Sequence, residues 1–222
     1  MNKAGQNRKV LSLFLAARRA AGEENMILYF DTETTGLRPG KICQLSYAMQ
    51  TAEGVTAKNM FFSVGYVEPS AAAVHGFTAE ILQELSGGLT FEDRFEEINA
   101  DFSAADVLVA HNFSFDFMFM RSEYERLGER FCYKNSFCSM KKFTPVCKLL
   151  RSDGKSYKYP KLTELCEFFD IYPYDVSRAS IALFGAAPSA HDARYDTAAL
   201  YLAVEEGMRR HTEMQEALSC AK

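Results

Sequence analysis

The sequence lacks several features that would place it in a special class of protein. No apolar run approaches the length needed to cross a bilayer. Its six cysteines are scattered without a Cys-x-x-Cys pair, which argues against a zinc ribbon and against a dense disulfide framework. A net charge of -4 excludes a protein that is basic over its whole surface, although it permits a local basic groove. We therefore expect a cytoplasmic protein with free thiols and no membrane contact.

The chain also shows no internal repeat, low-complexity tract or clear linker, so its 222 residues suit one sizeable domain. We predict an amphipathic lead-in helix over residues 1–25, a domain over residues 26–210 and a short tail over residues 211–222. The beginning of the chain superficially resembles a signal peptide. The pair Arg18-Arg19 stands where a small-residue cleavage site is expected, so the lead-in helix is the better interpretation.

Hydrophobic patterning predicts strands first and then alternating strands and helices, which is typical of an α/β fold with a mixed sheet covered by helices. The expected strands form a meander followed by two later strands: 26–31, 41–49, 56–64, 107–110 and 136–139. The expected helices are 78–86, 91–103, 114–127, 139–150, 161–169 and 192–209. The segment from 171 to 189 matches no motif, and we expect it to be a variable insertion.

The first expected strand runs directly into two carboxylates, Asp31 and Glu33. Side chains alternate along a strand, so both carboxylates project to one face and Thr32 projects to the other. Two anions this close raise each other's pKa unless a cation lies between them, and Mg²⁺ or Mn²⁺ prefers such oxygen ligands. The alternative is an ordinary solvated strand end, because exposed charges are common.

A second acidic position follows the short strand at 107–110. In the stretch VLVAHNFSFDFMFM, residues 107–120, a turn at His111 and Asn112 leads into a helix, and Asp116 falls in its first turn. Asn112 or Ser114 could cap that helix. By itself Asp116 is an ordinary carboxylate that the helix dipole favours.

A third acidic position lies in SAHDARYDTAAL, residues 189–200. His191 and Asp196 are five residues apart, about 140° around a helix, so they converge only if His191 precedes the helix. A surface histidine beside a solvated helix start is one alternative. Another is the His191-Asp192 doublet of an HD-type phosphohydrolase, but that all-helical fold disagrees with the strand-rich first third of the chain.

Together these stretches have the order and spacing of three known motifs: Phe-Asp-Thr-Glu-Thr-Thr-Gly-Leu (30–37), His-Asn-x-x-Phe-Asp (111–116) and His-x4-Asp (191–196). The chain resembles the DEDDh family of 3'-to-5' exonucleases, which includes the proofreading epsilon subunit of bacterial DNA polymerase III. The likeness covers roughly residues 26 to 208 and extends to VHGFTAEIL (74–82) and KLTELCEFFDI (161–171). It implies a ribonuclease H-like fold, with a five-stranded mixed sheet and helices on both faces.

The resemblance also implies a catalytic centre. Two Mg²⁺ or Mn²⁺ ions are expected on four carboxylates: Asp31, Glu33, Asp116 and Asp196. Two such cations can activate water, stabilise the leaving oxygen and offset the charge of the phosphate. His191 is expected to act as the general base, because imidazole titrates near neutral pH. The product would be a nucleoside 5'-monophosphate.

The pocket for the terminal nucleotide is expected beside the first two motifs. Its candidate residues are Thr34, Thr35, Gly36, Leu37, Val74, His75, Asn112 and Phe115. Gly36 would let the backbone approach the sugar closely, and Leu37 could wedge against a base. For His75, a role in capping a loop is an equally open interpretation.

A basic stretch separates the second and third motifs: Lys134, Lys141, Lys142, Lys148, Arg151, Lys155, Lys158 and Lys161, opposed by Asp153. Aromatic residues are interleaved with it: Phe137, Phe143, Tyr157 and Tyr159. This combination suits a single strand of nucleic acid, through phosphate contacts and base stacking. The alternative is a solvated helix face whose aromatic side chains belong to the core.

These features predict a 3'-to-5' exonuclease that acts on the 3' ends of single-stranded DNA, in repair or proofreading. DNA is favoured over RNA as the substrate. A polymerase or another replication or repair protein is a candidate partner. An exoribonuclease, or a non-catalytic nucleic-acid-binding module of the same fold, are the alternatives.

Overall fold

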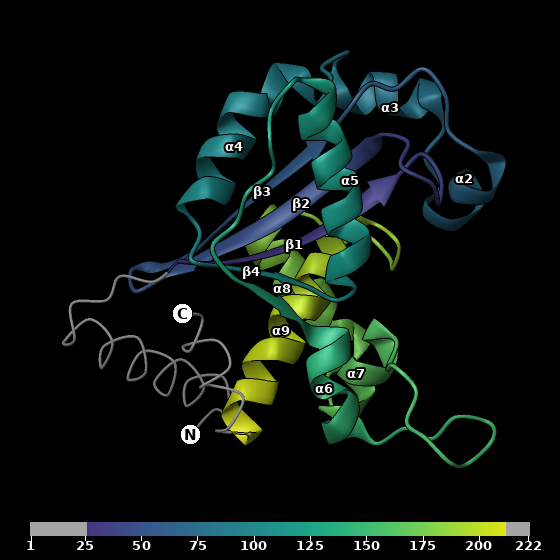
Figure 1. The fold of residues 1–222 in the computed structure, drawn as a ribbon, viewed down its shortest axis with the longest axis vertical. Helices are drawn as coiled ribbons and strands as arrows, with labels where there is room; N and C mark the ends of the chain where they lie inside the picture. The colour runs from purple at the N-terminus through teal and green to yellow at the C-terminus, as the bar shows by residue number, and fades with distance from the viewer. Residues whose placement is uncertain (1–25, 212–222) are drawn as a thin grey trace.

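The computed structural model describes residues 26–211 (Figure 1). The predicted lead-in helix over residues 1–25 lies outside the described residues, and so do residues 212–222, with Cys220, of the predicted tail. Between residues 26 and 211, no helix combines the length and the apolar character that a membrane span requires.

The described residues form one five-stranded sheet with the strand order β3-β2-β1-β4-β5. The strands are β1 (Ile27–Thr34), β2 (Ile42–Thr51), β3 (Gly54–Phe61), β4 (Val107–Ala110) and β5 (Ser136–Cys138). The first three strands are antiparallel neighbours, whereas β4 runs parallel to β1 and β5 parallel to β4. This arrangement confirms the predicted mixed sheet that begins with a meander.

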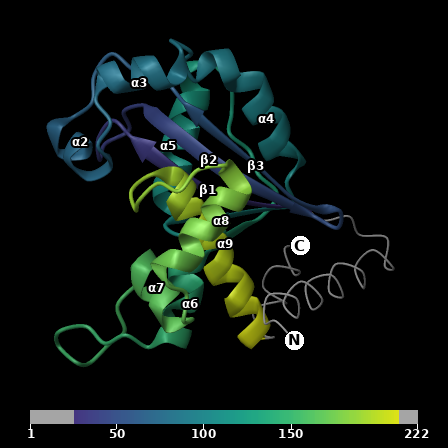
Figure 2. The ribbon, with the colours of Figure 1, turned by 180° about the vertical axis from the view of Figure 1, so that it is seen from behind.

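Helices cover both faces of the sheet (Figures 1 and 2). They are α2 (Pro69–His75), α3 (Ala79–Ser86), the 3-10 helix η1 (Glu92–Arg94), α4 (Phe95–Ala104), α5 (Phe113–Arg126), α6 (Ser139–Cys147), α7 (Leu162–Phe168), α8 (Pro173–Phe184) and α9 (Ala193–Arg210). On one face, α4 and α5 pack against Leu28 and Phe30 of β1. On the other, α6, α7 and α9 pack against Ile27 and Tyr29. The predicted ribonuclease H-like fold is confirmed.

Alternation along β1 explains this division into two cores. Leu28 and Phe30 point to the α5 face, whereas Tyr29 points to the α9 face, and all three are completely buried. A central strand that is covered on both sides shows a continuous apolar run, which is what residues 26–30 present. The same alternation then carries Asp31 to the α9 face.

Two helices were not predicted. None of the residues of α2 is buried, so α2 lacks an amphipathic pattern that a sequence could reveal. The segment 171–189, which we expected to be a variable insertion, contains α8, which packs on α9 and β3. Pro173 in its first turn and Gly185 in the left-handed conformation after its last residue were the available boundary signals.

The boundaries of the first three strands differ from the prediction by one to three residues, and the end of β1 is the difference that bears on the site. β1 continues to Thr34 rather than ending at residue 31, so Asp31 and Glu33 lie inside the strand. Each is opposite a buried polar residue of β2, with Ser46 facing Asp31 and Gln44 facing Glu33. Backbone pairing with β2 therefore fixes the two carboxylates more firmly than a loop would.

Candidate active site

Three carboxylates meet on the α9 face of β1. Asp31 and Glu33 come from the strand, and Asp196 comes from the first turn of α9. Each offers one oxygen, and these three oxygens lie within 4.8 Å of one another. The structure thus brings together three of the residues that the sequence motifs identified, from segments more than 160 residues apart.

The electrostatics of this cluster favour a cation. Burial raises the pKa of Asp31 well above its usual range, and the neighbouring charges of Asp116, Asp196 and Glu33 raise it further. Burial and the charge of Asp196 raise the pKa of Glu33 to about 9. Burial raises the pKa of Asp196 to about 6, against the lowering effect of the His191 backbone hydrogen bond. A bound divalent cation would relieve this repulsion, so the donor set fits the metal that the fold family implies.

Asp116 approaches the cluster from the other side of β1. It lies in the first turn of α5 and is 4% exposed. The Thr32 hydroxyl, which projects to this face as predicted, donates a hydrogen bond of 2.8 Å to Asp116 Oδ1. Burial raises the pKa of Asp116 to about 7, and the bond from Thr32 opposes the rise. Asp116 does not belong to the group of three oxygens, but it is the strongest of the charges that act on Asp31.

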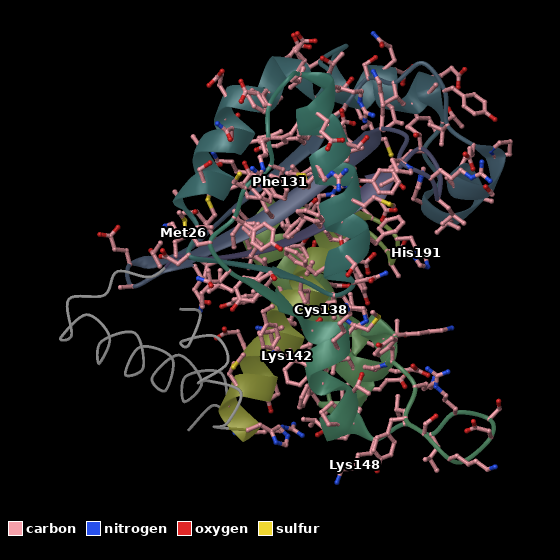
Figure 3. All side chains as sticks on the ribbon, viewed as in Figure 1. Met26, Phe131, Cys138, Lys142, Lys148 and His191 are labelled. Carbon is pink, nitrogen blue, oxygen red and sulfur yellow. The ribbon has the colours of Figure 1, made fainter. Side chains whose placement is uncertain are left out.

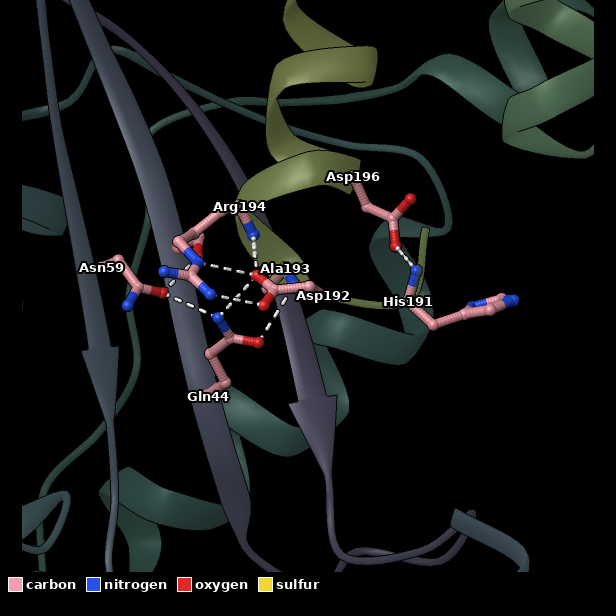
Figure 4. Close-up of polar contacts among 8 residues, drawn as sticks. Gln44, Asn59, His191, Asp192, Ala193, Arg194 and Asp196 are labelled. Carbon is pink, nitrogen blue, oxygen red and sulfur yellow. Dashed lines mark hydrogen bonds and ion pairs between the residues drawn. The ribbon is translucent and has the colours of Figure 1, made fainter. Parts of the chain in front are cut away.

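His191 is adjacent to the cluster, but its ring is turned outward. The residue precedes Asp192, the N-cap of α9, and its backbone N–H donates a hydrogen bond of 2.9 Å to Asp196 Oδ2. Figure 4 shows the imidazole pointing away from the Asp196 carboxylate, and Figure 3 shows His191 at the edge of the molecule. The structure therefore places the backbone of His191 at the cluster, whereas its side chain has to rotate to reach it.

A polar network that the sequence analysis missed fixes the start of α9 (Figure 4). Gln44 Nε2 donates to Asp192 Oδ1 at 2.9 Å, and Gln44 Oε1 accepts from the backbone N–H of Ala193 at 3.0 Å. Arg194 donates to both oxygens of Asp192, from Nε at 2.9 Å and from Nη2 at 2.7 Å. Burial alone would raise the pKa of Asp192, but the bonds from Arg194 and Gln44 hold it below the usual value. The network thereby orients the helix turn that carries Asp196.

One signal could have pointed to this network. Gln44 and Ser46 interrupt the apolar run of β2 at alternate positions and are both completely buried. Buried polar side chains need partners, and these two also share Asn59 of β3, at 2.8 Å from Gln44 and 2.7 Å from Ser46. Polar residues on one face of a central strand therefore indicated a polar neighbour on that face.

The candidate pocket residues of the first motif surround the end of β1. Thr34, Thr35 and Gly36 are buried, whereas Leu37 is 79% exposed. A Cβ atom at Gly36 would meet the carboxyl group of Glu68, so the close approach there is to the start of α2. The Glu68 backbone N–H donates to the carbonyl of Thr35 at 2.8 Å, which attaches α2 to this turn.

The remaining pocket candidates lie on two further elements. His75 ends α2, its Nε2 lies 3.2 Å from the carbonyl oxygen of Thr34, and its Nδ1 accepts from the Phe77 backbone N–H at 3.0 Å. Val74 is 56% exposed. At the start of α5, Asn112 is exposed and caps the helix without a side-chain hydrogen bond, whereas Phe115 is half-buried. His75 is thus tied to the backbone of the candidate pocket, and it also has the capping contact of the alternative interpretation.

Comparison with known proteins identifies the family. A family model described as exonuclease (RNase T) matches residues 28–204, which contain the acidic cluster and His191. The chain belongs to this exonuclease family. Its motifs make it a DEDDh-type member, and its acidic cluster, whose oxygens fit a divalent metal, lies on the central sheet of the fold. The parallel and antiparallel strands exclude the all-helical HD-type phosphohydrolase.

A polymerase is among the relatives of this exonuclease. Over 213 residues the chain is 30% identical to the DNA polymerase III PolC-type of Bacillus subtilis (strain 168). The aligned region covers 90% of the chain but only 13% of that relative. The chain therefore spans about an eighth of the length of this relative.

Solved structures of exonuclease I from E. coli have the same fold. The complex with a dA16 oligonucleotide has a TM-score of 0.67 and 16% identity, and the match covers 87% of this chain and 42% of that one. The zinc-bound form of a complex with single-stranded DNA has a TM-score of 0.67 and 17% identity, with the same coverage. At this level of identity, the likeness shows the fold alone.

Proposed function

We propose that this protein is a 3'-to-5' exonuclease that releases nucleoside 5'-monophosphates from the ends of single-stranded DNA with the help of two Mg²⁺ or Mn²⁺ ions. The observation that carries the proposal is the convergence of Asp31, Glu33 and Asp196, with their oxygens within 4.8 Å of one another, in a member of an exonuclease family. Burying or half-burying four carboxylates around the end of β1 costs folding free energy, which is unexpected unless their charge has a function.

The carboxylates would hold the cations. Asp31, Glu33 and Asp196, whose oxygens lie together, would be ligands, and Asp116 would support the site from α5. Bound cations supply a more acidic water and offset the charge of the phosphate. Thr32 keeps Asp116 oriented through its hydrogen bond, and the contacts of Gln44 and Arg194 keep Asp196 facing β1 through the fixed start of α9.

His191 would take the proton of the attacking water. In its outward position the ring is exposed and free to turn, and its backbone remains attached to Asp196 by the 2.9 Å hydrogen bond. A rotation about the side-chain torsions suffices to bring an imidazole nitrogen toward the cluster, and such rotations of exposed side chains are fast. His191 is therefore a general base that acts after substrate or metal has bound.

The exposed surface that follows the C-terminal end of β1 would bind the terminal nucleotide. Leu37 and Val74 present apolar surface there, and Thr34, Thr35 and Gly36 provide backbone groups at the strand end. The further candidates for this pocket are His75, Asn112 and Phe115. A site built to enclose one nucleotide requires a free strand end, and the resemblance to the DEDDh family assigns this end as the 3' end.

The comparisons favour DNA as the substrate. The structural neighbours from E. coli were solved with DNA oligonucleotides, and the relative from Bacillus subtilis is a DNA polymerase. A polymerase or another replication or repair protein in the cytoplasm is accordingly the proposed partner. An exoribonuclease is the competing assignment, and contacts to a 2'-hydroxyl would distinguish the two.

The decisive assay uses 5'-labelled single strands of DNA and of RNA with Mg²⁺, Mn²⁺ or EDTA. We expect a ladder of shortened DNA products with either metal and none with EDTA. A circular strand and a strand with a 3'-phosphate should resist, because neither offers a free 3'-hydroxyl. Asp31→Asn and Asp196→Asn should abolish the ladder while the protein stays folded.

Four results would contradict the proposal. Cleavage by either variant in EDTA would remove the metal site from the mechanism. Rapid cutting of the circular strand would identify an endonuclease instead. Degradation of RNA in strong preference to DNA would make the protein an exoribonuclease, whereas binding without cleavage in every metal would leave a nucleic-acid-binding module.

A further inference from the structure

A cationic hairpin stands out on this otherwise acidic protein. The segment between α6 and α7, residues 148–161, is called the basic hairpin here. It contains five cationic side chains and one carboxylate, Asp153, although the whole chain has a net charge of -4. Lys148, Arg151, Lys155 and Lys161 are exposed, and none of them pairs with a carboxylate of residues 26–211, whereas Lys158 pairs with Glu164. Such a concentration of positive charge favours a polyanion as its ligand.

The basic hairpin has a definite structure. Leu150 and Tyr157 form an isolated antiparallel bridge, and the backbone N–H of Lys158 donates to the carbonyl of Leu149 at 2.7 Å. Figures 1 and 2 show it projecting from α6 and α7, and Figure 3 shows Lys148 at the end of α6 where it begins. Its side chains are therefore displayed by a turn of fixed register and not by an irregular loop.

The aromatic residues of the basic stretch divide into two groups. Phe137 and Phe143 are completely buried in the core beneath α9, as the alternative interpretation of the sequence required. Tyr157 and Tyr159 are 44% and 52% exposed, and both lie in the basic hairpin. Exposed aromatic rings among unpaired cations are the combination that stacks the bases and binds the phosphates of a single strand.

A half-buried histidine connects the basic hairpin to the candidate active site. His111 follows β4, and its Nε2–H donates to the carbonyl of Pro160 at 3.0 Å while its Nδ1 lies 2.9 Å from the Ser139 hydroxyl. Burial lowers the pKa of His111 to about 4, so the ring stays neutral and keeps this bond at neutral pH. The next residue, Asn112, is a candidate for the nucleotide pocket. Pro160, which directly follows Tyr159 at the base of the hairpin, thus lies beside the end of β4, and β4 is the neighbour of the strand that carries Asp31 and Glu33.

We propose that the basic hairpin binds the nucleic-acid strand on the 5' side of the nucleotide being removed, with bases stacked on Tyr157 and Tyr159 and phosphates on Arg151, Lys155 and Lys161. This inference rests on the proposed function, because it assigns the rest of the strand whose 3' end enters the site. Such a contact would hold the shortened strand after each cleavage, and it would make affinity depend on strand length.

Binding to labelled oligonucleotides in EDTA tests the inference without any cleavage. Fluorescence anisotropy with dT20 should show that Tyr157→Ala/Tyr159→Ala weakens binding by about ten-fold or more, the usual range for loss of base stacking. Arg151→Ala/Lys155→Ala should reduce the slope of log K against log salt by about 1.4, since each phosphate contact on a single strand contributes about 0.7. Neither variant should change binding of dT2, which is too short to reach the hairpin. The same series with rU20 tests whether RNA uses this surface too.

Matched controls separate the hairpin from general effects. Tyr174 is 70% exposed on α8, and Arg130 is an exposed cation in the segment after α5. Tyr174→Ala and Arg130→Ala should bind dT20 like the wild type. Hydrolysis of the p-nitrophenyl ester of thymidine 5'-monophosphate, measured with Mn²⁺, needs the active site but no strand beyond the terminal nucleotide. It should be equal in the wild type and in both hairpin variants.

The outcomes distinguish this inference from the proposed function. If the hairpin variants bind dT20 as tightly as the wild type, the inference is overturned and the exonuclease assignment stays intact. An acidic protein surface would then be the remaining candidate ligand of the basic hairpin. Equal loss of ester hydrolysis would overturn it as well, because the hairpin would then be supporting the active site. A wild type that binds dT20 through the hairpin but cleaves neither DNA nor the ester would contradict the proposed function alone.

Discussion

His191 adopts a left-handed backbone conformation, with φ at 65°, which costs a residue with a side chain roughly 1–3 kcal/mol. The hydrogen bond from its N–H to Asp196 offsets part of that cost. A glycine would relieve the strain and an asparagine would reduce it, so the imidazole itself is the candidate reason for a histidine at this position. Two substitutions of His191 can therefore distinguish its effect on turnover from its effect on stability.

Replacement of His191 by either glycine or alanine should lower turnover by about 100- to 10,000-fold, the range expected when general-base assistance is lost. Both variants should bind Mn²⁺ like the wild type, because His191 is not assigned as a ligand. His191→Gly should be at least as stable to heat as the wild type, since glycine accepts the positive φ. Turnover is measured on labelled single-stranded DNA, and metal affinity by calorimetry. If either variant keeps near-wild-type turnover, His191 is not the base.

For single residues, the sequence predicted which residues belong to the site better than it predicted how their side chains are oriented. Strand alternation sufficed to place Asp31 and Glu33 on one face and Thr32 on the other, because this period is independent of tertiary contacts. The outward rotamer of His191 and the bond from Thr32 to Asp116 depend on contacts between segments far apart in the chain. Nothing in a local pattern specifies them.

Among the secondary-structure elements, α9 has the most connections to the rest of the fold. Its N-terminal turn carries Asp196, and its remaining length packs on β1, β2, α7 and α8. A long amphipathic helix of this kind is predictable from sequence, whereas α2, with no buried residue, is not. The network from Gln44 to Arg194 joins this helix to β2, and it involves isolated polar residues that no periodic pattern groups together.

Close packing of α9 on α6 predicts a cost for any side chain at Gly207. A Cβ atom there would overlap the ring of Phe143, which is completely buried. Gly207→Ala gains about 1 kcal/mol of helix propensity but overpacks the core at a cost of about 1–3 kcal/mol. We expect a net loss of up to about 2 kcal/mol in the free energy of unfolding, measured by urea denaturation.

Two further variants test the cause of that loss. Phe143→Leu in the Gly207→Ala background should recover part of the stability, because the smaller side chain leaves room for the new methyl group. Gly65→Ala is the control, since a Cβ atom at Gly65 meets nothing within 4 Å. A Gly207→Ala protein that is more stable than the wild type by about the 1 kcal/mol of helix propensity would mean that α6 and α9 are not packed as closely as described.

For the molecule as a whole, the acidic cluster makes stability depend on pH and on metal together. A carboxyl whose pKa is raised by folding binds more protons in the folded state, so the free energy of unfolding falls as pH rises toward the folded pKa. This applies to Asp31, to Glu33 with a pKa of about 9 and to Asp116 with a pKa of about 7. His111, whose pKa burial lowers from 6.5 to about 4, produces the opposite trend only between those two values. Above pH 6.5 the carboxyls therefore determine the direction.

In EDTA, we expect the urea midpoint to fall between about pH 6.5 and about pH 9. Mg²⁺ should raise the midpoint, and more at pH 9 than at pH 6.5, because the ligands must be deprotonated to bind it. Glu205, at the other end of α9, has a pKa that burial raises to about 7 and adds to the fall, so the difference between Mg²⁺ and EDTA is the quantity that isolates the cluster. Asp196→Asn should shrink that difference and raise the midpoint in EDTA at pH 9, since one crowded anion is gone. A wild-type midpoint in EDTA that rises from pH 6.5 to pH 9 would contradict the raised pKa values, and an equal response to Mg²⁺ at both ends of the range would show that the cation does not bind these carboxylates.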